Sequence, residues 1–279
     1  QALTDFFGRP AVCVVNGTAA LQLALQACGI GAGDEVLVPS LTYLASFQAI
    51  SATGAKPVAC DIDRETYTID WKDAEKRINK HTKAIMPVHY MGGVGNLTEI
   101  HKFARRKKLR VIEDAAHAFG TKYKGERVGG FGDVACFSFD GIKNITSGEG
   151  GCIVTDDESV LEIVKDARLL GVQKDTEKRF SGQRSWDFEV KIQGWRYHMS
   201  NIMAAIGIEQ LKRFDKLAAL RCNCAMYYDK LLEANKKIKI IRHNYLEVIP
   251  HIYVIRIIGL KDREKLREKL LHTGIQTGI

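Results

Sequence analysis

One lysine stands where a strand-like apolar run meets a loop of small residues. In the segment SFDGIKNITSGEGG, residues 138–151, Lys143 follows Gly141 and one isoleucine and precedes Asn144. A lysine directly after a buried strand loses hydration, which lowers its pKa and makes its amine nucleophilic. The alternative is an ordinary solvated lysine, because most lysines lie on the surface. The glycines that follow indicate a tight loop with another group packed close by.

A second candidate segment combines carboxylates with a histidine. In VIEDAAHAFG, a β-branched run delivers Glu113 and Asp114, and His117 follows three residues after Asp114. Ligands of open α/β sheets collect at the carboxyl ends of the strands, where a carboxylate can hold a protonated ring nitrogen. The alternative is an aspartate that only caps the next turn.

A third candidate is a helix start of the kind that binds phosphate. The stretch VVNGTAALQLAL contains Asn16, Gly17 and Thr18 just before an Ala/Leu-rich run. Glycine allows close approach to the backbone, and the free N–H groups and the helix dipole favour a phosphate. Simple N-capping by Asn16 or Thr18 explains the same residues equally well.

A fourth candidate is an aromatic and basic cluster late in the chain. In QGWRYHMSN, Trp195, Arg196, Tyr197 and His198 follow one another. Arginine beside aromatic rings suits a phosphate or a nucleotide. An ordinary loop docked on the core has the same composition, so the alternative stays open.

The elements that position these segments alternate along the first 155 residues. Short β-branched runs separate longer amphipathic segments, which is typical of a mainly parallel sheet covered by helices on both faces. The predicted strands are residues 35–39, 56–61, 83–89, 109–115, 134–140 and 151–156, and the predicted helices are about 18–28, 42–53, 70–80, 96–107 and 157–169.

The pattern changes after about residue 172. A polar loop leads to a helix predicted from Ser200 to about Leu232, and two strand-like runs and a charged helix at 262–272 follow. We therefore expect a large α/β domain over residues 1–205, and a long helix with part of a small α+β domain over 206–279. The chain starts with Gln1 and stops just after a helix, so we expect the small domain to be truncated.

Charge and cysteine content limit the classes of function that the chain can have. Residues 201–279 carry 15 Lys and Arg against 8 Asp and Glu, but the signs alternate, which favours a solvated helix over a nucleic-acid surface. The seven cysteines form no CxxC pair and show no metal-ligand spacing, so we expect reduced thiols, a cytoplasmic protein and no metal. No apolar run is long enough to span a bilayer and no signal peptide is visible.

The candidate segments together, in this order and spacing, resemble the DegT/DnrJ/EryC1/StrS sugar aminotransferases, which are fold-type I pyridoxal phosphate enzymes. The resemblance runs from about Gly8 to the end of the chain and implies a three-layer, aspartate aminotransferase-like fold. The segments that carry it are NGTAALQLAL, GDEVLVPSLTYLAS, EDAAHAFGTKYKGERVGGFGDVACFSF, KNITSGEGG and MSNIMAAIGIEQL.

The resemblance implies roles for three residues in catalysis. Lys143 would form the Schiff base with pyridoxal 5'-phosphate and, once freed, shuttle a proton while the cofactor passes through its pyridoxamine form. Asp114 would keep the pyridine nitrogen protonated. His117 matches the position that contacts the 3-hydroxyl of the ring.

It also implies how the rest of the cofactor is held. Gly17 and Thr18 match the phosphate cradle, and Ser138 matches a hydroxyl that binds the same phosphate. Tyr43 matches the aromatic residue that stacks on the cofactor.

One segment departs from the family pattern. The family usually has G-Y-N-Y-R before the long helix, and its Asn reaches the phosphate of the neighbouring subunit's cofactor. Here Arg196 replaces that Asn and His198 replaces the Arg. Arg196 is expected to contact this phosphate or the phosphates of a nucleotide.

A member of this family is expected to be a homodimer with active sites at the subunit interface. Its usual reaction moves an amino group from glutamate to a 3- or 4-keto nucleotide-linked deoxysugar, and the amino sugar serves polysaccharide or natural-product synthesis. A related dehydratase is the first alternative, but there a histidine replaces the lysine. A non-catalytic regulatory or binding protein is the second.

Overall fold

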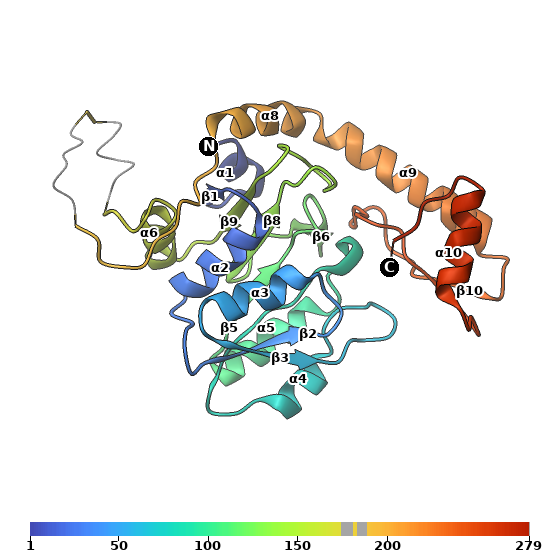
Figure 1. Ribbon diagram of the computed structural model, residues 1–279, viewed down its shortest axis with the longest axis horizontal. Helices are drawn as coiled ribbons and strands as arrows, with labels where there is room; N and C mark the ends of the chain where they lie inside the picture. The colour runs from blue at the N-terminus through green and yellow to red at the C-terminus, as the bar shows by residue number, and fades with distance from the viewer. Residues whose placement is uncertain (174–180, 183–188, 279) are drawn as a thin grey trace.

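A seven-stranded sheet forms the centre of the computed structural model, which describes residues 1–173, 181–182 and 189–278 (Figure 1). The strand order is β1-β9-β8-β5-β4-β2-β3. The strands are β1 (Ala11–Val14), β2 (Glu35–Pro39), β3 (Lys56–Cys60), β4 (Thr82–Ile85), β5 (Arg110–Asp114), β8 (Val134–Ser138) and β9 (Gly151–Val154).

The sheet is mainly parallel, as the sequence predicts. Only β9 runs against its neighbours β1 and β8, whereas the pairs from β8 through β5, β4 and β2 to β3 are parallel. The predicted strand at 83–89 ends early, at Ile85, because Pro87 has no N–H for a regular ladder. The chain still follows β5 beyond it, since the Asp114 N–H donates to the Pro87 carbonyl (2.9 Å).

Helices cover both faces of the sheet, which confirms the three-layer prediction. One face packs against α2, α3 and α6 through a core of Val, Ile, Leu and Ala side chains, and the other packs against α4 and α5. The five predicted helices are present, with small shifts at their ends. Their bounds are α2 (Gly17–Ala27), α3 (Leu44–Ala52), α4 (Trp71–Arg77), α5 (Leu97–Lys107) and α6 (Glu158–Ala167).

The period of two along the strands decides which side chains share a face. On β5, Ile112 packs in the core under α2 and α3, whereas Val111 packs on the α5 side. Asp114 therefore lies on the α2/α3 face and Glu113 on the α5 face. On β8 the same alternation puts Ser138 on the α2/α3 face. The ends of two neighbouring strands thus bring Asp114 and Ser138 to one side of the sheet.

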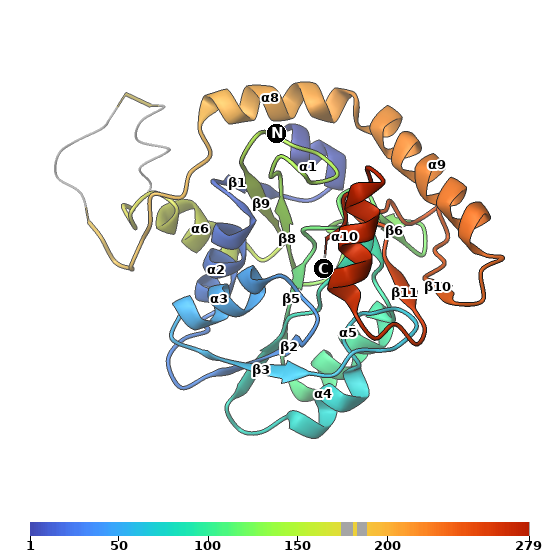
Figure 2. The same cartoon turned by 45° about the vertical axis from the view of Figure 1, so that its right-hand side comes forward.

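The predicted single helix from Ser200 to Leu232 is wrong at one point, because the chain bends at Arg213. It forms α8 (Asn201–Lys212) and α9 (Phe214–Leu232), which together arch over one end of the sheet (Figure 2). Phe214, 3% exposed, packs edge-on against Phe119 with ring centroids 5.0 Å apart. The bend directs this ring into the core, a long-range contact that helical periodicity does not reveal.

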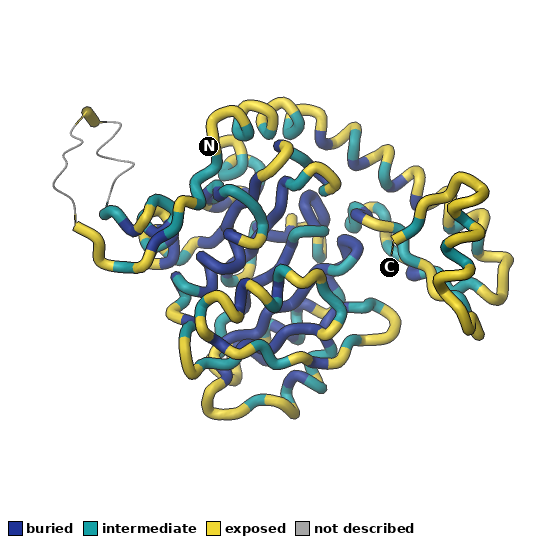
Figure 3. The backbone as a smooth tube through the Cα atoms, in the orientation of Figure 1, coloured by how far each residue is buried: buried dark blue, intermediate teal, exposed yellow. Residues whose placement is uncertain are grey.

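The C-terminal part contains a small sheet and an exposed helix. Strands β10 (Ile238–Ile240) and β11 (Ile255–Ile257) pair antiparallel, and α10 (Arg263–His272) has no buried residue (Figure 3). The exposure of α10 agrees with a solvated helix, and the choice of this interpretation over a nucleic-acid surface stays a prediction. The boundary at residues 205 and 206 lies inside α8, and the division into two domains there stays a prediction.

Four short elements complete the fold. They are the helix α1 (Ala2–Phe7), the 3-10 helix η1 (Tyr90–Gly92), and the strands β6 (Lys122–Tyr123) and β7 (Glu126–Arg127), which pair as a hairpin. Across the described ranges, no helix combines the length and the apolar character that crossing a membrane requires.

Candidate active site

Lys143 lies in the loop after β8, partly buried. Its backbone N–H donates to the Asp140 carbonyl (3.0 Å), and the next residue, Asn144, is 3% exposed. Burial lowers the pKa of the Lys143 amine, although the nearby carboxylates of Asp114 and Asp140 act in the opposite direction. A lowered pKa increases the fraction of neutral, nucleophilic amine at neutral pH. The ordinary surface lysine is therefore the poorer interpretation.

Asp114 ends β5 and is 6% exposed. Its Oδ2 accepts a hydrogen bond from Ser46 Oγ (2.7 Å), and its Oδ1 accepts one from the Ala116 N–H (3.2 Å). Burial raises the pKa of Asp114, and these hydrogen bonds and the charge of Lys143 partly offset it. The aspartate does cap the following turn, as the alternative predicted, but a buried carboxylate beside Lys143 also suits a protonated ring nitrogen.

Gly17 and Ser138 meet at the start of α2. A Cβ on Gly17 would lie 2.8 Å from the Cβ of Ser138 and 3.2 Å from its Oγ, so only glycine fits without a shift of the chain. Asn16 caps the helix by accepting from the Ala19 N–H (2.8 Å). Within the described residues, the N–H groups of Gly17 and Thr18 donate no hydrogen bond outside α2. The cap by Asn16 is thus present, and the N–H groups of Gly17 and Thr18 leave a geometry that fits a phosphate.

His117 follows β5 on the loop that faces Lys143. Burial lowers the pKa of His117 to about 2, and the neighbouring His251 and Lys143 act in the same direction. The imidazole is therefore neutral near pH 7. Its Nδ1 atom is buried and has no hydrogen-bond partner within the described residues. A neutral ring nitrogen without a partner can form a hydrogen bond with the hydroxyl group of a bound ring.

Tyr43 begins α3, the helix that also carries Ser46. Its side chain is 75% exposed, which leaves the ring open to stacking on a planar ligand. Ser46 is a site residue that the sequence predictions did not include. The only signal for it is its position three residues after Tyr43, one helical turn away.

Arg196 lies apart from the residues described above. Its neighbours Trp195 and Tyr197 stack on each other (ring centroids 5.7 Å apart) and donate hydrogen bonds to Gln26 and Gln22 on α2. These contacts confirm a loop docked on the core for the two aromatic residues. The side chain of Arg196 is exposed. Within one chain, the structure does not bring it to Lys143.

Glu113 points to the other face of the sheet and serves a structural purpose. Its Oε2 lies 2.7 Å from His89 Nε2, and its Oε1 lies 3.4 Å from His101 Nε2. Burial by itself raises the pKa of Glu113, but the hydrogen bonds and charges of His101 and His89 lower it to about 2. This carboxylate is fully buried and pairs with histidines on the face of the sheet opposite Asp114.

Comparison with known proteins decides the family. A sequence profile of the DegT/DnrJ/EryC1/StrS aminotransferase family matches residues 1–279. The chain belongs to this aminotransferase family. It is 40% identical to an uncharacterized protein of Methanocaldococcus jannaschii over 278 residues (96% of this chain, 71% of the relative). It is 41% identical to GDP-perosamine synthase of Escherichia coli O157:H7, again over 278 residues (96% and 70%).

A solved relative has the same fold. The protein Spr1654 of Streptococcus pneumoniae, assigned as a sugar aminotransferase, matches in its PMP form with a TM-score of 0.91 and 31% identity, over 99% of this chain and 74% of that chain. The same protein has also been solved in a PLP form. The family depends on pyridoxal phosphate, and the family and fold predicted from the sequence are confirmed.

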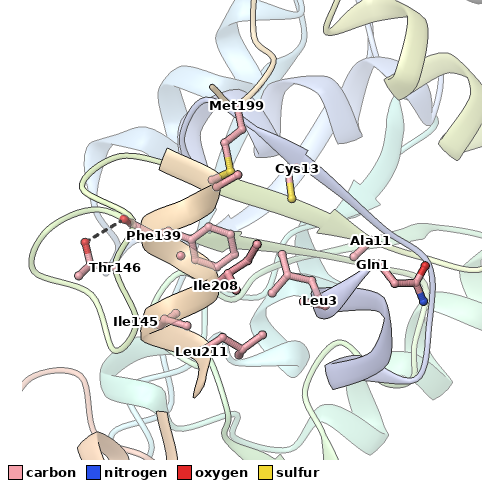
Figure 4. Close-up of a pocket in the computed structure, with 13 residues that line it drawn as sticks. Gln1, Leu3, Ala11, Cys13, Phe139, Ile145, Thr146, Met199, Ile208 and Leu211 are labelled. Atoms are coloured by element: carbon pink, nitrogen blue, oxygen red, sulfur yellow. Dashed lines mark hydrogen bonds between the residues drawn. The ribbon is translucent and has the colours of Figure 1, made fainter. Parts of the chain in front are cut away.

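An apolar cavity lies between α8 and the N-terminal elements α1 and β1, and neither Lys143 nor Asp114 lines it (Figure 4). It has a volume of about 170 Å³. Its lining includes Leu3, Phe139, Met199 and Leu211, and the dashed line in Figure 4 joins Thr146 to Phe139. With so few polar groups, this cavity does not suit a phosphorylated cofactor.

Proposed function

We propose that this protein is an aminotransferase that moves an amino group from glutamate to a 3- or 4-keto nucleotide-linked deoxysugar. The observation that carries the proposal is the meeting of a partly buried lysine, a buried aspartate and a glycine–serine phosphate cradle at one end of the sheet. The substrate class is supported by the Escherichia coli relative, which is a GDP-perosamine synthase. The product is an amino sugar for a polysaccharide or a natural product.

Lys143 and Asp114 share the chemistry. When bound, pyridoxal phosphate supplies a conjugated ring that accepts electrons from the α-carbon of the amino donor. The Lys143 amine, partly neutral because burial lowers its pKa, removes a proton at that carbon and returns one to the acceptor. Asp114, anchored by Ser46, holds the proton on the ring nitrogen. Both groups reach the site from the ends of neighbouring parallel strands.

The remaining residues bind and orient. The N–H groups of Gly17 and Thr18 and the hydroxyl of Ser138 hold the phosphate at the positive end of the α2 dipole. His117 hydrogen-bonds the 3-hydroxyl, and the exposed ring of Tyr43 covers the face of the cofactor. Together these residues would hold the cofactor and fix its orientation before the substrate arrives.

A second copy of the chain completes the site in this proposal. Arg196 is exposed and lies apart from Lys143 in its own chain, which fits a side chain that reaches the cofactor phosphate or the nucleotide of a neighbouring subunit. We further propose that the enzyme acts in the cytoplasm, where its keto-sugar substrate is made.

Incubation of the purified protein with pyridoxal phosphate, glutamate and a panel of nucleotide-linked 3-keto and 4-keto sugars tests the proposal. We expect a visible absorption band that borohydride removes, and transfer of nitrogen from ¹⁵N-glutamate to one sugar of the panel. Loss of a sugar hydroxyl without nitrogen transfer would instead identify a dehydratase. A protein that stays colourless would identify a binding protein.

A further inference from the structure

A segment from the C-terminal part of the chain crosses the active-site end of the large sheet. We name residues 247–251 the crossing segment. The Lys122 N–H donates to the Glu247 carbonyl (2.8 Å), and the Ile249 N–H donates to Thr121 Oγ1 (3.1 Å). The His251 N–H donates to the Met91 carbonyl (3.1 Å). These contacts fix the crossing segment against the loops that follow β4 and β5.

Two side chains tie the crossing segment to the residues around Lys143. Asn144 Nδ2 donates to the carbonyl of His117 (3.3 Å) and to that of Ile249 (3.2 Å). Arg221, on α9, donates from Nη1 to the His251 carbonyl (3.1 Å) and from Nη2 to the Lys143 carbonyl (3.3 Å). The positions of His117, Lys143 and His251 are therefore linked through shared donors.

The His251 ring packs directly on the ring of His117. The ring centroids are 4.2 Å apart at an interplanar angle of 41°, and His251 is only 8% exposed. The Nδ1 atoms of both rings are buried and, in the described part of the chain, have no hydrogen-bond partner. The ring of Tyr90 lies 6.0 Å from that of His117. His117 thus has neighbouring rings from two different parts of the chain.

The electrostatics favour two neutral rings. Burial lowers the pKa of His251 to about 3, and the charges of Lys143 and Arg221 reinforce this effect, while Asp140 opposes it weakly. A protonated His251 would face the cations of Lys143 and Arg221 in a dry environment, which is unfavourable. His251 therefore stacks on His117 as an uncharged aromatic ring.

We propose that His251 is a positioning residue of the active site, which stacks on His117 and fixes the orientation of the ring that His117 presents to the cofactor. This inference rests on the proposed function only for the role of His117 toward the cofactor. The stacking itself belongs to the protein without ligand. No other residue of the crossing segment has an aromatic side chain.

Histidine NMR on the cofactor-free protein tests the stacking. In the wild type we expect the His117 ring signal, assigned by its loss in His117→Gln, to stay unchanged between about pH 5 and 9. In His251→Ala, water reaches His117, so the desolvation of its ring decreases, its pKa rises and the signal titrates within that range. In His251→Phe, an aromatic ring still covers His117, and the signal stays flat.

His243→Ala is the matched control. His243 belongs to the same C-terminal part, is partly buried, and packs against Gly93, near η1, but not on His117. We expect no change in the His117 signal of this variant. An untitrated His117 in folded His251→Ala, or titration in His251→Phe equal to that in His251→Ala, would overturn the inference.

Cofactor binding gives the second readout. The loss of one aromatic stacking contact predicts that His251→Ala binds pyridoxal phosphate about 2- to 10-fold more weakly, and that His251→Phe binds nearly as the wild type does. If the cofactor does not bind the wild type at all, the proposed function fails, whereas the NMR result on His117 still stands. If the cofactor binds and reacts but the NMR signals of all variants agree, only the role of His251 fails.

Discussion

Burial acts on the two central residues of the site in opposite directions. It lowers the pKa of Lys143 and raises the pKa of Asp114, so both groups are pushed toward their uncharged forms in the protein without ligand. Each also stabilises the charge of the other, which limits both shifts. A phosphorylated ring with a basic nitrogen restores a charged partner for Asp114. The site therefore holds electrostatic strain that a cofactor of this chemistry relieves.

Lys143→Ala tests the central residue. We expect transamination to fall by about 10²- to 10⁴-fold or more, because the group that moves the proton is lost. The melting temperature should stay near the wild-type value, since the side chain makes no hydrogen bond or ion pair among the described contacts. The control is Lys165→Ala, an exposed lysine on α6. Near-normal turnover of Lys143→Ala would remove Lys143 from the mechanism.

Asp114→Asn separates catalysis from stability. The rate should fall by about 10²- to 10³-fold, because an amide does not hold the proton on the ring nitrogen. The folded-state pKa of Asp114 lies above its unfolded value, so the wild type loses stability as the pH rises through that interval. Without cofactor, Asp114→Asn should therefore melt higher than the wild type at pH 7, and the difference should shrink in acid. Calorimetry across pH checks this, and a lower melting temperature at pH 7 would contradict it.

Gly17→Ala tests the phosphate cradle. The added Cβ would lie 2.8 Å from the Cβ of Ser138, so α2 or β8 must shift where the phosphate binds. We expect the dissociation constant of pyridoxal phosphate to rise about tenfold or more, which corresponds to about 1.4 kcal/mol. Gly31→Ala is the control, because its Cβ would meet only the Thr53 carbonyl at an ordinary 3.7 Å. Equal affinities for the two variants would exclude the cradle.

At the scale of elements, a glycine in the loop after β4 allows the crossing segment to pack closely against that loop. Gly92 has a φ of +96°, and a Cβ there would collide with the carbonyl oxygen of Ile249. The neighbouring Gly93 has no positive φ, and a Cβ there would meet the His243 ring at 3.1 Å and the Tyr90 carbonyl oxygen at an ordinary 3.5 Å. The loop after β4 thus approaches the crossing segment closely at Gly92, whereas the nearest atoms to a Cβ on Gly93 belong to other residues.

Gly92→Ala and Gly93→Ala form a matched pair. We expect Gly92→Ala to lower the free energy of unfolding by about 1–3 kcal/mol, because a positive φ is strained for alanine and the crossing segment must move. Gly93→Ala should change it by less than about 1 kcal/mol. Chemical denaturation measures both. A similar loss in the two variants would show that the crossing segment is not tightly held at Gly92.

At the scale of the whole molecule, α8 is a helix without a buried residue. Three of its exposed residues have large apolar side chains: Ile202, Ile206 and Ile208 are 73%, 42% and 46% exposed. Neighbouring exposed apolar side chains on one helix are typical of a surface that another molecule covers. Such a surface fits the proposed homodimer, in which the exposed Arg196 just before α8 faces the second copy.

Ile202→Asp tests this surface. We expect the wild type to sediment as a dimer. In the variant, the dissociation constant of the dimer should rise by about tenfold or more, because a buried unpaired carboxylate opposes association. Leu271→Asp on α10 is the control, since Leu271 is also largely exposed (62%) but lies on the solvated helix. A monomeric wild type would refute the dimer, and an unaffected Ile202→Asp would place the interface elsewhere.

The sequence by itself determined six of the seven strands of the large sheet, the five helices that cover it, and the positions of Lys143, Asp114 and Gly17 near strand and helix ends, because these depend on local periodicity and turn residues. The order and spacing of its motifs indicated the family. The short elements α1 and β1, which carry little periodicity, were not predicted. The tertiary structure supplied the physical reason why Asp114 and not Glu113 faces the site, because it fixed which face of β5 packs under α2 and α3. It also decided that Ser46, 68 residues from Asp114 in the chain, anchors it, that His251 stacks on His117, and that the long helix bends at Arg213. Each of these depends on contacts between distant segments, which no local pattern contains.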